Sequence, residues 1–145
     1  MDKNVELLEY IYQDADMGVK SLTNLINAIN NKDNKIKKLV EEKLKGYEEI
    51  LKKSKKLLKD YQAEPKSKGL KADLGSLMGI KMELMKDNSD ARIADMIIKC
   101  FTMGIIDAEK RIDKYKKEVD RKVLNIAKEI KEFQEQGIKD LKAYL

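Results

Sequence analysis

The side chains with the clearest capacity for chemistry are four carboxylates beside apolar positions of helical patterns: Asp14, Asp16, Glu48 and Asp107. Carboxylate oxygens that point inward at one level of a helical protein can hold a metal ion. The competing interpretation is that these acids are boundary residues whose carboxylates stay in water, since charged groups are seldom buried without a partner. We favour the second interpretation and expect no metal site and no cofactor.

The 145-residue chain contains no histidine, which removes several classes of chemistry. Histidine metal sites, Ser-His-Asp and Cys-His nucleophiles and imidazole acid–base steps are excluded, because no other side chain titrates near neutrality without help. The single Cys100 cannot form an internal disulfide, which fits a reducing compartment. We therefore expect no catalytic residues and a protein that is not an enzyme.

The composition is typical of a single-domain cytoplasmic protein. The 31 basic and 26 acidic side chains give a formal net charge of +5, and 39% of the residues are charged. The acidic start, residues 1–6, lacks a signal-peptide core, and the longest apolar run, residues 96–106, is interrupted by Lys99. We expect one domain over residues 1–145, located in the cytoplasm and with no membrane partner.

Apolar residues recur at spacings of three and four along almost the whole chain, which is typical of amphipathic helices. Leu, Lys, Glu, Ala and Ile dominate the long stretches, and the one proline, Pro65, marks a loop. The helices expected from this pattern cover residues 3–30, 34–63, 70–87, 90–116 and 119–144.

The apolar period continues without a glycine or proline through residues 116–120, but the charges predict a reversal there. Lys114, Lys116 and Lys117 suit the negative end of a helix dipole, and Glu118 and Asp120 suit the positive start of the next helix. Without this reversal, residues 90–145 would form one helix of about 80 Å, which is suited to a coiled-coil dimer.

With the reversal, short turns join the first and last pairs of long helices, and a long crossover joins the two pairs. This connection pattern predicts an all-α, ferritin-like four-helix bundle of two helix hairpins, with a short amphipathic helix in the crossover. The di-iron sites of such bundles need a Glu-x-x-His pair from each of two helices, which this chain cannot supply.

Three segments carry a resemblance to a known family: VELLEYIY at residues 5–12, TMGIID at residues 102–107 and FQEQ at residues 133–136. They resemble uncharacterised ferritin-like four-helix-bundle proteins, DUF2383-like and of clostridial type, over nearly the whole chain. The resemblance implies a ferritin-like fold without di-iron ligands and carries no established activity.

Each of the four long helices is expected to contain one internal glycine: Gly18, Gly46, Gly104 and Gly137. Each glycine in a helix costs about 1 kcal/mol of stability relative to alanine. We expect this loss to be offset by close packing of the neighbouring helices, which a glycine permits. The functional alternative is a gap in the bundle core that binds a small apolar ligand or a metal. In that case a Gly104→Ala substitution should abolish binding and leave the fold as stable or more stable. Its candidate residues are Asp16, Gly18, Met103, Gly104 and Asp107.

The leading hypothesis is association with a second copy or a protein partner, because the crossover helix has an apolar face rich in methionine. The candidate association residues are Leu74, Leu77, Met78, Met82 and Met85.

Weak nucleic-acid binding through the second long helix is a further alternative. Residues 31–62 contain eleven lysines against six acids, but this segment has no arginine and its tyrosines lie in the apolar stripe. We do not expect nucleic acid to be the main partner.

Overall fold

The computed structural model describes residues 2–66 and 87–145, and four long helices dominate these residues. They are α1 (Lys3–Ala28), α2 (Lys37–Asp60), α4 (Asp90–Tyr115) and α5 (Arg121–Leu141), followed by the short 3-10 helix η1 (Lys142–Tyr144). No strand occurs in the described ranges. The prediction of an all-α bundle is confirmed.

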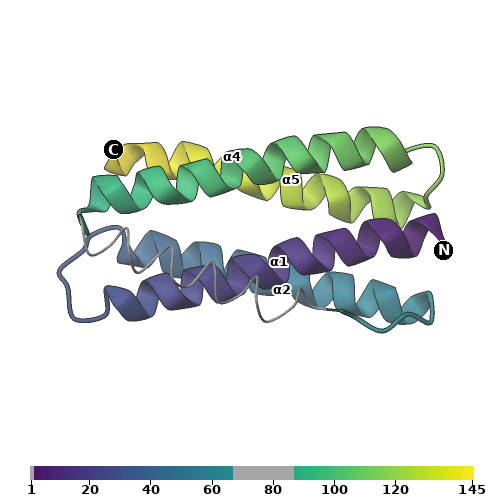
Figure 1. Cartoon of the computed structure of the whole chain (residues 1–145), viewed down its shortest axis with the longest axis horizontal. Helices are drawn as coiled ribbons and strands as arrows, with labels where there is room; N and C mark the ends of the chain where they lie inside the picture. The colour runs from purple at the N-terminus through teal and green to yellow at the C-terminus, as the bar shows by residue number, and fades with distance from the viewer. Residues whose placement is uncertain (1, 67–86) are drawn as a thin grey trace.

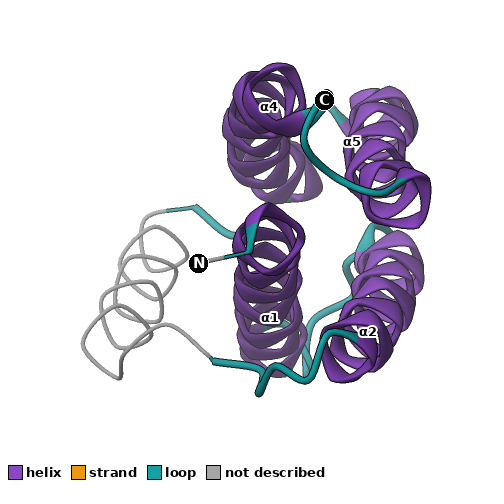
Figure 2. Cartoon of the chain, turned by 90° about the vertical axis from the view of Figure 1, so that its right-hand side faces the viewer, coloured by secondary structure: helices purple, strands orange, loops and turns teal. Residues whose placement is uncertain are grey.

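The helices form two antiparallel hairpins, α1 with α2 and α4 with α5 (Figure 1). Viewed along the bundle, α4 lies beside α1 and α5 lies beside α2, so each hairpin forms one side of a four-helix arrangement (Figure 2). The end of α2 and the start of α4 are at opposite ends of the bundle. The association residues predicted between 70 and 87 lie outside the described residues, and Asp87, which is described, is not helical.

The first hairpin turn is longer than the apolar pattern predicts, because α1 ends at Ala28 rather than residue 30 and α2 begins at Lys37 rather than residue 34. The Asn34 amide nitrogen donates to the Asn88 carbonyl at 3.0 Å and to the Asp90 carboxylate at 2.9 Å. Asn34 therefore ties the turn to the start of α4 instead of extending α2.

Helix α2 also ends before the predicted residue 63. Gln62 has φ of 57°, in the left-handed region that a right-handed helix cannot include. The Tyr61 hydroxyl donates a hydrogen bond to the Asp120 carboxylate, which holds this end of α2 against the second hairpin.

The reversal predicted near residues 116–120 is present, since α4 ends at Tyr115 and α5 begins at Arg121. The backbone N–H of Asp120 donates to the Asn4 side chain at 2.7 Å, so this turn packs on the start of α1. Residues 90–145 are therefore two helices and not one long helix.

The internal glycines lie where side chains of neighbouring helices need room. A Cβ atom on Gly46 would be 2.2 Å from a ring carbon of Phe133, and one on Gly137 would be 2.3 Å from a ring carbon of Phe101. The rings of Phe101 and Phe133 also pack against Tyr47, with centroids 5.7 and 4.8 Å from its ring. Close packing thus explains these glycines, as the first interpretation predicted.

Candidate ligand site between α1 and α4

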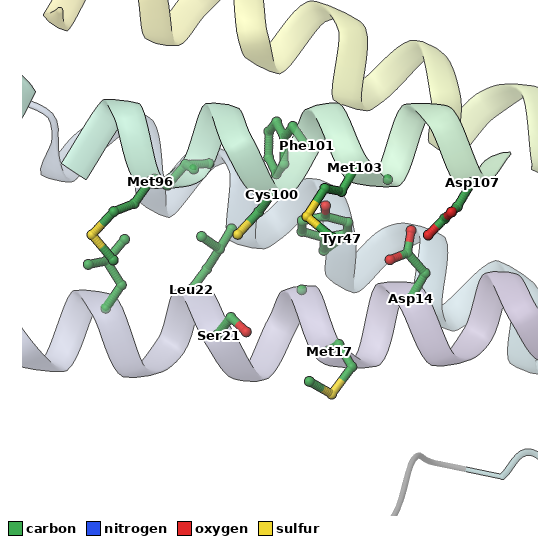
Figure 3. A pocket seen from close by; sticks show the side chains of 14 residues that line it. Asp14, Met17, Ser21, Leu22, Tyr47, Met96, Cys100, Phe101, Met103 and Asp107 are labelled. Carbon is green, nitrogen blue, oxygen red and sulfur yellow. The ribbon is translucent and has the colours of Figure 1, made fainter. Parts of the chain in front are cut away.

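A cavity of about 340 Å³ lies between α1 and α4, and most of its surface is apolar. We call it the apolar cavity. In Figure 3, Met96, Cys100, Met103 and Asp107 extend from α4 toward α1, and Leu22 extends from α1 toward α4. Its lining residues are Asp14, Met17, Gly18, Ser21, Leu22, Leu25, Tyr47, Met96, Ile97, Cys100, Phe101, Met103, Gly104 and Asp107.

Helical spacing places the α4 residues of this cavity on one face. Met96, Cys100, Met103 and Asp107 follow one another at intervals of four, three and four residues. Together they present two thioethers, a thiol and a carboxylate to the same space. Thioether side chains are flexible and polarizable, so this wall can adapt to an apolar molecule.

Four of the five residues predicted for a core ligand site lie on this cavity: Gly18, Met103, Gly104 and Asp107. The fifth, Asp16, does not. Its side chain is buried and forms an ion pair with Lys20 on the same helix, with Nζ 3.0 Å from a carboxylate oxygen.

The methyl group of a Gly104→Ala substitution would point toward α5. A Cβ atom on Gly104 would be 2.5 Å from the amide nitrogen of Gln134, which belongs to α5. The added methyl would therefore displace a buried side chain behind the cavity wall, rather than fill the cavity.

Gln134 links the cavity wall to the polar interior of the bundle. It is 1% exposed, and its amide nitrogen donates to the Asp14 carboxylate and to the Tyr47 hydroxyl, each at 3.1 Å. Its amide oxygen is buried without a hydrogen-bond partner in the described part of the chain. The hydrogen bond from Gln134 fixes the position of the Asp14 carboxylate. Burial raises the pKa of Tyr47, so its hydroxyl stays neutral.

A second cavity, also of about 340 Å³, adjoins the first, and we call it the polar cavity. Asp14 and Asp107 line both cavities and point toward one another across the space between α1 and α4 (Figure 3). The polar cavity is lined by Glu6, Glu9, Tyr10, Gln13, Asp14, Asp107, Arg111 and Tyr115.

Among the described residues that line the polar cavity, four are carboxylates and one, Arg111, is a cation. The Arg111 guanidinium stacks on the Tyr10 ring, 4.3 Å from its centroid. Burial raises the pKa of Tyr10, and the charges of Asp14 and Asp107 raise it further.

Cys100 lines the apolar cavity and is exposed. Partial burial raises the pKa of its thiol, which disfavours the reactive thiolate. We therefore assign Cys100 a lining role and not a nucleophilic one. Ser21, Met96 and Cys100 are site residues that sequence reasoning missed, although the spacing from Met103 could have indicated the α4 pair.

Within residues 2–66 and 87–145, no group of three or more Cys, Asp or Glu side chains is arranged to hold a metal ion. None of the helices that the structure describes is both long enough and apolar enough to cross a membrane. The lysine-rich face of α2 is interrupted by opposite charge, since Lys53 pairs with Glu129 of α5 at 2.8 Å.

Comparison with protein-family models, with curated proteins and with solved structures finds no match to this chain.

Proposed function

We propose that this protein binds a small apolar ligand between α1 and α4 and performs no catalysis. The apolar cavity carries this proposal. Its volume of about 340 Å³ lies at the lower end of the range of small-molecule sites, which are mostly apolar and contain a few convergent polar groups. Asp14 and Asp107 supply such groups at one end of the cavity.

The packing of the rest of the bundle supports a binding role for this space. Protein interiors are close-packed, and the core beside the cavity follows this rule, with an aromatic ring in the space beside each of Gly46 and Gly137. At the cavity, by contrast, Met103 is 68% exposed although it is a large apolar side chain. A bound apolar molecule would cover Met103 and gain about 25 cal/mol for each Å² of apolar surface removed from water.

We further propose that the bundle is ferritin-like and belongs with the DUF2383-like proteins that its sequence resembles. The two antiparallel hairpins and the opposite positions of the α2 end and the α4 start support this topology. Since the chain has no histidine, its use of the bundle would differ from di-iron chemistry.

The direct test uses N-phenyl-1-naphthylamine, an uncharged probe whose fluorescence rises in apolar surroundings. We expect saturable binding by the wild-type protein and its loss in Cys100→Phe, whose ring would occupy the cavity. Thr102→Phe is the matched control, because it adds the same ring at an exposed α4 position that does not line the cavity. Absence of saturable binding by the wild type, or equal binding by both variants, would contradict the proposal.

Self-association through α4 is a second candidate function, favoured by two exposed apolar side chains one helical turn apart. Met103 is 68% exposed and Ile106 is 47% exposed. Light scattering after size exclusion should then give a mass that rises with concentration in the wild type and stays monomeric in Ile106→Lys. A wild-type protein that is monomeric at every concentration would contradict this candidate.

A further inference from the structure

Three methionines line the apolar cavity, and they differ in their contact with water. Met17 of α1 and Met96 of α4 are half-buried, whereas Met103 of α4 is 68% exposed. Two other large apolar side chains of the described residues are exposed, Leu145 at 65% and Ile106 at 47%, and neither lines the cavity. Met103 is therefore the methionine of the cavity wall that reagents dissolved in water reach most easily.

A thioether that water reaches can be oxidised by a peroxide. With hydrogen peroxide, a lone pair of the sulfur attacks one peroxide oxygen, the O–O bond breaks and an S–O bond forms. The second oxygen leaves as water, so the sulfur loses two electrons and the peroxide gains them. The product is methionine sulfoxide, which is polar, and methionine sulfoxide reductases return it to the thioether.

The sulfoxide would weaken the contact between the cavity wall and an apolar ligand. Met103 extends from α4 toward α1 (Figure 3), so a ligand in the cavity covers this side chain. Covering the thioether is favourable, because it removes apolar surface from water. Covering the sulfoxide is unfavourable, because its oxygen loses hydrogen bonds to water. Asp107, one turn further along the same wall, does not compensate, since a carboxylate accepts hydrogen bonds and does not donate them.

We propose that Met103 is an oxidation site, and that its conversion to the sulfoxide by a peroxide releases the apolar ligand from the cavity. This inference rests on the proposed function, since it names a form of regulation for the same site. Reduction of the sulfoxide restores the apolar wall, so the regulation is reversible.

The exposure of Met103 also separates loss of binding from loss of the fold. Without a ligand the sulfoxide oxygen stays in water, so its formation should cost little stability. The change in the midpoint of thermal unfolding that peroxide causes should therefore be the same in the wild type and in Met103→Leu. A larger decrease in the wild type would show that oxidation of Met103 acts through the fold, which would overturn the proposed effect on the ligand.

The experiment measures the affinity for N-phenyl-1-naphthylamine before and after hydrogen peroxide, which catalase removes before the probe is added. In the wild type the dissociation constant should rise about tenfold, as the burial of one polar group implies, and a methionine sulfoxide reductase should restore it. In Met103→Leu the affinity should be the same before and after peroxide. Met96→Leu is the matched control, because it removes a half-buried thioether of the same wall and should leave the sensitivity to peroxide.

Peptide mapping by mass spectrometry follows the oxidation itself. Met103 should gain one oxygen before Met17 and Met96 do. Earlier oxidation of either half-buried methionine would overturn the inference, whether or not the probe binds.

The binding outcomes separate this inference from the proposed function. If Met103 is oxidised and the wild type still binds the probe equally well, the inference is overturned and the apolar site stands. Continued loss of affinity in Met103→Leu would also overturn it, because Cys100 and the other methionines are present in that variant. Absence of probe binding before peroxide would overturn both.

Discussion

Around Gly46 the interface between α2 and α5 is filled by interlocking side chains, although a cavity of about 430 Å³ with mostly charged and polar lining residues lies between the same helices near Lys53 and Lys122. The interface between α1 and α4 contains the apolar and the polar cavity. Phe133 of α5 packs into the space beside Gly46 of α2, and the ion pair Lys43–Asp140 joins the same helices at 2.8 Å. In the other interface, the glycines Gly18 and Gly104 each accept a side chain from elsewhere, and the methionines leave space between the helices. The same bundle thus contains a tightly packed region around Phe133 and an apolar cavity between α1 and α4.

The largest expected effect follows from removing the Phe133 ring, which fills the space beside Gly46. Phe133→Ala should lower the free energy of unfolding by about 3 kcal/mol, because it deletes packing against both Gly46 and Tyr47. Met17→Ala, which changes the wall of the apolar cavity, should cost less than about 1 kcal/mol. Urea denaturation of the two variants measures the contrast, and equal losses would remove the distinction between the interfaces.

Adding one methyl group should also affect the two interfaces differently. Gly46→Ala should destabilise by about 1–3 kcal/mol, because the methyl meets the Phe133 ring at 2.2 Å. This loss should exceed the gain of about 1 kcal/mol in helix propensity. Gly104→Ala should cost less, since the group that it meets is the flexible end of Gln134. Thermal unfolding of both variants checks the order, and a more stable Gly46→Ala protein would contradict it.

The smallest effect concerns the ion pair between α2 and α5. Lys43 donates to Asp140 and lowers the pKa of that carboxyl, so the folded state holds the charged form better than the unfolded state does. The resulting stability is present above the ordinary aspartate pKa of about 4 and is lost as pH falls through the lowered value.

Lys43→Met should therefore cost about 1 kcal/mol at pH 7, a modest figure because the Asp140 side chain is 34% exposed. At a pH of about 2 the variant and the wild type should differ much less. Urea titrations at the two pH values measure the difference, and a loss that is the same at both would show that packing of the lysine stem, not its charge, is responsible.

The sequence predicted the helices well because apolar spacing and charge act locally. The reversal at residues 116–120 was predicted from lysines before acids, and α4 does end at Tyr115. The helix ends were less accurate, since Asn34 and Gln62 take conformations fixed by contacts with the second hairpin and by the turn itself.

Prediction of the site was limited because the sequence pattern does not specify which face of each helix points toward its neighbour. Gly18 and Gly104 indicate the correct level of the bundle, but the sequence analysis predicts Asp16 at the site and the structure places Asp14 on the cavity. Two residues along a helix are about 200° apart, so one of the pair had to face elsewhere. Which one faces α4 depends on how the two hairpins pack together, which the sequence pattern of α1 alone does not specify.

The hairpins are fastened to one another at both ends of the bundle. Asn34 bonds to Asp90 at one end, and Asn4 bonds to Asp120 at the other. These contacts restrain α1 and α4 at both ends of the bundle. A ligand would therefore reach the cavity between the two helices without their separation. Rotation of methionine and cysteine side chains at the rim would suffice, and such motions of exposed groups take picoseconds to nanoseconds. We therefore expect a ligand to enter and leave without unfolding of either hairpin.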